Sequence, residues 1–204
     1  MNDIETIMRT APVIPVIVID NLDHAVPLAR ALVAGGLRVL EVTLRTPVAL
    51  DAIKAMKQVS GAIIGAGTVI NPQQLAQVQA AGAEFVVSPG LTENLGHACK
   101  EAGMPYLPGV ANAGDIMRGL DLGLSNFKFF PAMTSGGLPA LKALAAPFHQ
   151  CKFCPTGGIG PDNTAEWLAF DPVLCVGGSW VAPRGKPDEA SVEAAARAAM
   201  KLSA

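Results

Sequence analysis

The sequence predicts a single-domain (β/α)₈ TIM barrel with a short N-terminal helix. Short apolar runs alternate with amphipathic, alanine-rich stretches along all 204 residues. The apolar runs lack a regular polar–apolar alternation, as expected for parallel strands covered by helices on the outside. Eight such units favour a closed barrel over an open, doubly wound sheet. No linker or low-complexity segment interrupts the pattern, so residues 1–204 are expected to form one barrel domain.

The expected elements follow the chain in strict order after an N-terminal helix over residues 3–9. Asparagine followed by proline at Asn71-Pro72 marks a helix start, and glycines such as Gly35, Gly82 and Gly103 mark helix ends. The predicted strands cover residues 13–19, 37–44, 62–67, 85–88, 104–107, 127–130, 152–155 and 173–176. The predicted helices cover residues 22–34, 48–59, 72–81, 93–102, 113–120, 138–145, 163–170 and 189–201.

Composition and charge narrow the class of function. The formal net charge is −2 and no basic run is present, which argues against nucleic acid as a partner. The apolar stretches are too short to span a membrane. The first residues carry acids and no apolar core, so no signal peptide is expected and the protein is predicted to be cytoplasmic.

The cysteines and histidines do not predict a metal or redox site. Cys151 and Cys154 have CxxC spacing, but two strand residues three apart face opposite sides. Buried thiols in a reducing compartment are therefore favoured over a redox pair. His24, His97 and His149 are scattered over predicted helices and helix ends, so no metal site is expected.

The second predicted strand places three polar side chains on one face. The period of two aligns Glu41, Thr43 and Arg45. Such a face requires a polar cavity or a closed network. Glu41 is a candidate proton shuttle and Arg45 a candidate clamp for a carboxylate. A purely structural Glu–Arg pair is the alternative.

Small residues end the third and fourth strands. Thr68 follows Gly65-Ala66-Gly67, where a ligand could approach the backbone and meet the hydroxyl. The fourth strand ends in the tight turn Ser88-Pro89-Gly90. Each signal alone is weak, because glycine and proline also end strands for structural reasons.

Lys128 is a cation within an otherwise fully apolar strand. Burial lowers the pKa of a lysine and leaves an amine that attacks carbonyl carbon. A snorkelling lysine or a structural ion pair is the alternative. Lys152 is also flanked by apolar residues, but it begins its strand, whereas Lys128 lies near the end where barrel active sites form. Lys128 is therefore the preferred nucleophile, with Phe130 on the same face.

Paired glycines follow the seventh and eighth strands, which in barrels often bind phosphate. Their free backbone N–H groups predict an anion nest, and a helix start behind them would add a favourable dipole. Thr156 and Ser179 stand beside the pairs. Neither loop matches a Walker or Rossmann fingerprint, so ATP and NAD are not predicted. The residues of the two loops are Thr156, Gly157, Gly158, Gly177, Gly178 and Ser179.

Six segments together resemble one family. They are LEVTLRT (40–46), GAGTV (65–69), SPG (88–90), FKFFPA (127–132), FCPTGGI (153–159) and VGGSW (176–180). They resemble the class I aldolases that cleave 2-keto-3-deoxy-6-phosphogluconate (KDPG) in the Entner–Doudoroff pathway, a family that includes the 4-hydroxy-2-oxoglutarate aldolases. The resemblance implies a lyase that acts on a phosphorylated 2-keto acid without a metal or organic cofactor, and commonly a homotrimer.

The resemblance also implies a role for each matched residue. Lys128 resembles the Schiff-base lysine and Glu41 the general acid/base. Arg45 and Thr68 resemble the groups that hold the pyruvate carboxylate. The remaining matched residues resemble those that line the substrate: Pro89 and Phe130 at the pyruvyl end, and Thr156, Gly157, Gly158, Gly177, Gly178 and Ser179 at the hydroxyl and phosphate end.

One position differs from the family pattern. Met133 follows Ala132, where many members have glutamate. This difference concerns aldehyde specificity rather than retro-aldol chemistry. Three alternatives remain open at this point: a 2-keto-3-deoxy-6-phosphogalactonate aldolase, a phosphate-binding isomerase or epimerase that uses Glu41 as base, and a non-catalytic barrel that senses a phosphorylated sugar acid.

Overall fold

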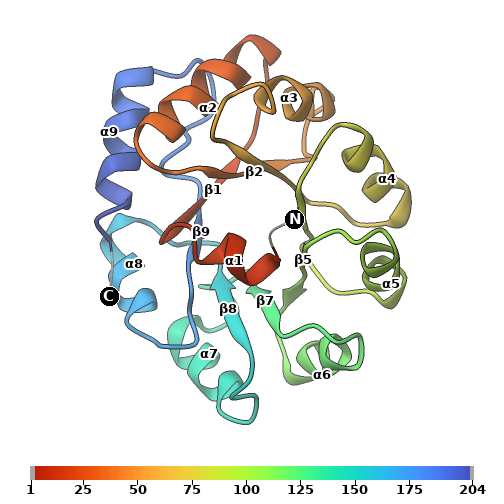
Figure 1. The fold of residues 1–204 in the computed structure, drawn as a ribbon. Helices are drawn as coiled ribbons and strands as arrows, with labels where there is room; N and C mark the ends of the chain where they lie inside the picture. Colours follow the sequence, from red (N-terminus) through yellow and green to blue (C-terminus); the bar gives the residue numbers. More distant parts are fainter. Residues whose placement is uncertain (1–2, 203–204) are drawn as a thin grey trace.

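The computed structural model describes residues 3–202, and its parallel strands form a ring surrounded by helices (Figure 1). The strands are β1 (Val13–Ile17), β2 (Val39–Thr43), β3 (Ile63–Gly67), β4 (Phe85–Val87), β5 (Tyr106–Leu107), β6 (Gly109–Val110), β7 (Asn126–Phe129), β8 (Lys152–Pro155) and β9 (Val176–Gly178). The helices are α1 (Ile4–Met8), η1 (Leu22–His24), α2 (Ala25–Ala34), α3 (Ala49–Met56), α4 (Pro72–Ala80), α5 (Glu93–Glu101), α6 (Ala113–Asp121), α7 (Gly137–Ala145), α8 (Pro161–Leu168) and α9 (Glu189–Ala199).

The strand order confirms the predicted barrel. One run of parallel strands has the order β5-β4-β3-β2-β1-β9, and a second has the order β6-β7-β8. Two isolated parallel bridges, Phe153 to Val173 and Thr156 to Gly177, join β8 to the chain at β9. Strands β5 and β6 are consecutive pieces of one barrel position, separated by Pro108. The ring therefore has eight positions.

Two predicted strands had wrong bounds. The strand predicted at 104–107 begins at Tyr106 and resumes after Pro108, because proline has no N–H to donate to the ladder. The strand predicted at 173–176 lies at Val176–Gly178 instead, where Gly177 and Gly178 pair with Ile14 and Pro15. Its glycines suggested a loop, yet they pair in register with β1.

Side-chain caps start several helices at the carboxyl-terminal side of the strands. Asn71, Thr92 and Asn112 each accept a hydrogen bond from a backbone N–H in the first turn of α4, α5 and α6. Such caps satisfy donors that a helix start leaves unpaired. They make the strand-to-helix loops short and well defined, which is where a barrel places its site.

The core has two parts. The larger lies between the strands and the outer helices, and the smaller fills the barrel interior. Ile7 and Met8 of α1 belong to the interior part together with Val39 and Phe85, the first residues of β2 and β4. Helix α1 thus covers the amino-terminal end of the barrel and crosses its centre in Figure 1. The opposite end remains available for chemistry.

Within residues 3–202, no helix combines the length and apolar character that a membrane crossing requires.

Candidate active site

A buried ion pair joins opposite sides of the barrel interior. Lys128 is the third residue of β7 and Glu41 the third residue of β2. Lys128 Nζ lies 3.4 Å from Glu41 Oε1, and the two side chains are 5% and 4% exposed. Among the ion pairs of residues 3–202, only this one is buried on both sides. Two charges removed from water cost several kcal/mol in desolvation, so a pair in such a place indicates function more than stability.

Gly67 makes the position of Glu41 possible. It is the last residue of β3, and a Cβ at this position would lie 2.1 Å from Glu41 Oε1. The carboxylate therefore occupies the space that any other side chain on this residue would take. Gly67 is therefore small for a structural reason, which is to admit Glu41 across the barrel.

Phe130 connects the lysine to an open cavity. The Lys128 ammonium lies 5.0 Å from the centroid of the Phe130 ring, within the range of a cation–π contact. Phe130 also borders a cavity of about 140 Å³ at the carboxyl-terminal mouth. The cavity is lined by Val16, Val18, Arg45, Phe130, Thr156, Gly157, Gly158, Ile159, Gly177 and Ser179.

The glycine loop after β8 has the backbone that the sequence suggested. Gly157 and Gly158 have φ values of 106° and 77°, which few other residues adopt. Helix α8 begins at Pro161, directly after this loop. The loop and the helix start together favour an anion at this side of the cavity.

The second glycine pair behaves differently, and the helix start predicted directly behind it is wrong. Gly177 and Gly178 are extended strand residues, and the next helix begins only at Glu189. At Gly177 a Cβ would lie 2.2 Å from Thr156 Oγ1, so this glycine makes room for Thr156. At Gly178 a Cβ would collide with the Trp180 ring. Gly178 does not line the cavity, whereas Gly177 and Ser179 do.

Arg45 and Thr68 meet at the cavity rim. Arg45 Nε donates a hydrogen bond of 3.3 Å to Thr68 Oγ1. Thr68 has φ 61°, which makes it the one non-glycine residue with positive φ in the part of the chain that the structure describes. A β-branched residue in this region stores roughly 1–3 kcal/mol of strain, and such strain concentrates at functional sites.

The three polar side chains predicted on one face of β2 have different environments in the structure. Thr43 Oγ1 donates to the Ile17 carbonyl at 2.9 Å, so its hydroxyl is held by the backbone of β1. Arg45 lies beyond the end of β2 and is exposed. Glu41 and Arg45 therefore do not form a structural pair. Glu41 faces Lys128 and Arg45 faces the cavity.

Pro89 lies beside the strand that carries the lysine. A Cβ on Gly109 would be 2.2 Å from the Pro89 carbonyl oxygen, so the Pro89–Gly90 peptide rests directly on Gly109 of β6. Gly109 is the register partner of Lys128. The turn after β4 therefore contacts the residue that pairs with Lys128 in the sheet.

The rival lysine has a different environment. Lys152 is the first residue of β8, and its Nζ lies 3.1 Å from Asp171 Oδ2, a side chain that is 94% exposed. This is a surface ion pair at the amino-terminal end of the barrel, away from the cavity. The contrast with Lys128 supports the choice made from strand position.

The cysteines are free and buried, as the sequence suggested. Cys151 packs in the outer core and Cys154 in the barrel interior, so the CxxC spacing separates them. The Cys154 sulfur, burial and the Glu41 carboxylate together raise the pKa of Cys175 well above its ordinary value. Glu41 therefore has a neutral thiol near it. No cluster of three metal-ligating side chains occurs within residues 3–202.

Sequence reasoning missed several residues of the site. Val16, Val18 and Ile159 line the cavity. The two valines share one face of the chain at β1, a signal that a period-two reading could have found. Gly67 carried no such signal, since its role depends on how Glu41 crosses the barrel.

A buried lysine beside a carboxylate, at the carboxyl-terminal mouth of a parallel barrel, is the arrangement expected of barrel enzymes that form a Schiff base with a carbonyl substrate. The model of the KDPG and KHG aldolase family matches residues 4–195. The chain belongs to this family.

Individual relatives agree. The chain is 60% identical over 199 residues to the 2-dehydro-3-deoxy-phosphogluconate aldolase of Zymomonas mobilis, covering 98% of this chain and 96% of the relative. It is 59% identical over 180 residues to the KHG/KDPG aldolase of Escherichia coli, covering 88% and 84%.

Solved structures give the same result. The aldolase of Zymomonas mobilis ZM4 with 3-phosphoglycerate has a TM-score of 0.97 and 59% identity, covering 99% of this chain and 97% of that one. The KDPG aldolase of Legionella pneumophila, with pyruvate captured as a covalent carbinolamine, has a TM-score of 0.95 and 46% identity, covering 98% and 99%.

Proposed function

We propose that this chain cleaves KDPG to pyruvate and glyceraldehyde 3-phosphate through a Schiff base on Lys128. It is a class I aldolase, a carbon–carbon lyase. The observation that carries the proposal is the buried pair of Lys128 and Glu41, 3.4 Å apart at the carboxyl-terminal mouth of the barrel. The carbinolamine captured in the Legionella pneumophila relative supports covalent chemistry with pyruvate.

The first half of the reaction makes an electron sink. A proton passes from the Lys128 ammonium to the Glu41 carboxylate, and the free amine attacks C2 of the keto acid. Glu41 returns a proton to the carbinolamine hydroxyl, which leaves as water. The product is an iminium ion at C2, whose positive charge withdraws electrons from the neighbouring carbon–carbon bond.

The second half breaks the bond and releases pyruvate. Glu41, again a carboxylate, removes the proton of the C4 hydroxyl while the C3–C4 electrons move into the iminium. The aldehyde departs and an enamine of pyruvate remains on Lys128. Protonation at C3 and attack of water at C2 then free pyruvate and regenerate the amine.

The carboxylate and the phosphate of the substrate are both held away from the reacting carbon, and together they orient the bond that breaks. This lowers the barrier by fixing a reactive geometry. Arg45, held by Thr68, binds the substrate carboxylate, and Pro89 and Phe130 line the pyruvyl end. Arg45 is the one charged side chain on the described cavity wall, which supports this role.

The phosphate end belongs at the loops after β8 and β9. Thr156, Gly157, Gly158, Gly177 and Ser179 line one cavity. Gly178 supports this wall indirectly, because it lies against Trp180. The 3-phosphoglycerate in the Zymomonas mobilis relative supports a phosphorylated three-carbon unit as a ligand of this kind of site.

A second substrate has specific support. The Escherichia coli relative, 59% identical, is a KHG/KDPG aldolase, so cleavage of 4-hydroxy-2-oxoglutarate to pyruvate and glyoxylate belongs to the proposal. The similarity to a KDPGal structure is lower, at 27% identity, so a galactonate-derived substrate is disfavoured. The isomerase and sensor alternatives leave the buried Lys128 without a role.

We also propose that one barrel domain over residues 1–204 carries the whole activity, that three copies assemble into a homotrimer, and that the enzyme works in the cytoplasm. The four buried free cysteines are consistent with a reducing compartment. Light scattering coupled to size exclusion tests the trimer directly.

A substrate panel tests the proposed function. Pyruvate release is followed with lactate dehydrogenase and NADH, with KDPG, its galactonate epimer and 4-hydroxy-2-oxoglutarate as substrates. The expected order of kcat/KM is KDPG first, and Lys128→Ala abolishes turnover of all three. Lys152→Ala serves as the matched control and retains activity. A protein that releases no pyruvate from any of the three contradicts the proposal.

A further inference from the structure

A buried hydrogen-bond chain ends at the turn after β4, which contacts Gly109, the residue that pairs with Lys128 in the sheet. The Tyr106 hydroxyl lies 2.7 Å from Ser88 Oγ, and Ser88 Oγ donates to the Gly90 carbonyl at 2.6 Å. Tyr106 is 3% exposed and Ser88 is 1% exposed. Neither residue belongs to the catalytic pair or to the cavity lining described above.

The direction of the chain follows from its chemistry. A serine hydroxyl has one proton. Ser88 gives that proton to Gly90, so Tyr106 is the donor to Ser88. Burial raises the pKa of Tyr106 well above its ordinary value of 10.0, which keeps the phenol protonated at neutral pH. The tyrosine thus acts as a fixed donor that orients Ser88 toward the turn.

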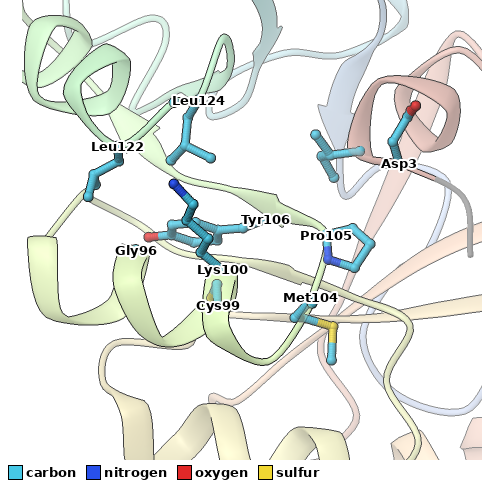
Figure 2. Close-up of a pocket in the computed structure, with 12 residues that line it drawn as sticks. Asp3, Gly96, Cys99, Lys100, Met104, Pro105, Tyr106, Leu122 and Leu124 are labelled. Atoms are coloured by element: carbon cyan, nitrogen blue, oxygen red, sulfur yellow. The ribbon is translucent and has the colours of Figure 1, made fainter.

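The ring of Tyr106 forms part of the wall of a second cavity, which faces outward. This cavity of about 390 Å³ lies among Cys99 and Lys100 of α5, Met104, and Leu122 and Leu124 near β7. Figure 2 shows the Tyr106 ring in its wall, between α5 and the two leucines. The tyrosine therefore reaches from the helical layer to the turn after β4.

The turn passes the constraint on to the lysine strand. The Pro89–Gly90 peptide rests on Gly109, where a Cβ would be only 2.2 Å from the Pro89 oxygen. Gly109 pairs with Lys128 in the sheet. A shift of this turn would therefore change the space in which the pyruvyl group meets the amine.

We propose that Tyr106 is a positioning residue, which fixes the Ser88-Pro89-Gly90 turn and through it the pyruvyl side of the active site. The proposal rests on the proposed function, since it assigns the pyruvyl end to Pro89. It predicts that losing the hydroxyl impairs the reaction with pyruvate and leaves the phosphate side unaffected.

The first test is Tyr106→Phe, which removes only the hydroxyl. Trapping with pyruvate and cyanoborohydride is followed by intact mass. The expected loss in the second-order rate constant is about 3- to 10-fold, the scale of one hydrogen bond. In the condensation direction, KM for pyruvate rises by a similar factor, while KM for glyceraldehyde 3-phosphate stays within about 2-fold of the wild type.

Cys99→Ala is the matched control. Cys99 is buried beside Tyr106 and lines the same outer cavity, so its truncation loosens the packing without removing the hydroxyl. The trapping rate of this variant is expected to equal that of the wild type. Equal losses in Tyr106→Phe and Cys99→Ala would show a general packing effect and overturn the proposal.

A second measurement needs no substitution. Tyr106 is the one tyrosine in the chain, so growth on 3-fluorotyrosine places a single fluorine label beside its hydroxyl. The ¹⁹F resonance is expected to shift when pyruvate is reduced onto the enzyme, and to stay unchanged with inorganic phosphate alone. This experiment keeps the proposal testable even if Tyr106→Phe does not fold.

The outcomes separate the two claims. If the wild type gains no pyruvate adduct, the proposed function fails. If the adduct forms but the ¹⁹F resonance does not move, or the trapping rate of Tyr106→Phe equals that of the wild type, the function stands and the positioning role of Tyr106 is wrong.

Discussion

Gly67→Ala should damage catalysis through a single methyl group. A Cβ at this position lies 2.1 Å from Glu41 Oε1, whereas real Cβ contacts are essentially never shorter than 3.0 Å. The carboxylate must therefore move by at least 3.0 − 2.1 = 0.9 Å. Its present distance to Lys128 Nζ is 3.4 Å, so a displacement of this size removes it from useful reach.

The expected effect is large on kcat and moderate on stability. Misplacement of a catalytic group by about 1 Å costs on the order of 100-fold in rate. Inserting one methyl group into a packed interior costs about 1–3 kcal/mol in the free energy of unfolding. We therefore expect kcat for KDPG to fall by about 100-fold in a protein that still folds at 25 °C.

Gly65→Ala is the matched comparison. Gly65 is two residues earlier on the same face of β3, and its Cβ would collide with the Phe85 ring at 2.2 Å. This variant overpacks the same interior without contacting the carboxylate. Urea unfolding and steady-state kinetics are measured on both. A folded Gly67→Ala enzyme with kcat within about 2-fold of the wild type would refute the reasoning.

Three further predictions follow from the same geometry. Glu41→Gln keeps the shape of the side chain but removes the base, and should lower kcat roughly 10²- to 10⁴-fold in the pyruvate-release assay. Trapping with pyruvate and borohydride should still label Lys128 in this variant. Arg45→Ala should raise KM for pyruvate more than KM for glyceraldehyde 3-phosphate in the condensation direction, because Arg45 holds the carboxylate. Burial raises the pKa of Cys99 from 9.0 to about 12 and that of Tyr106 above 10.0. The unfolded chain releases these protons first, so their stabilisation is complete below about pH 9 and is lost as the pH rises toward 12, which urea titrations at successive pH values measure.

Strand position was the most informative sequence signal. Lys128 and Lys152 stand in similar apolar surroundings, yet one ends near the mouth and the other starts at the opposite end. Because all strands of a barrel run in one direction, position along the strand translates directly into position in the molecule. This explains why the fold and the different locations of Lys128 and Lys152 were predictable from the sequence of one chain.

Side-chain contacts between neighbouring strands were not predictable in the same way. The approach of Glu41 to Gly67 and the bond from Tyr106 to Ser88 depend on barrel stagger and side-chain rotamers, which periodicity does not encode. Glycine was also ambiguous. Gly157 adopts positive φ in a loop, whereas Gly177 extends in β9 to admit Thr156. Two Gly-Gly sequences therefore adopt two different backbone conformations in this chain.

Chemical trapping tests the central claim most directly. The protein is incubated with pyruvate, reduced with borohydride, digested and sequenced by mass spectrometry. The account predicts one adduct, equal to pyruvate less one water plus two hydrogens, on Lys128 alone, and none in Lys128→Ala. No adduct, or an adduct on Lys152, contradicts the assignment of the buried lysine as the covalent centre.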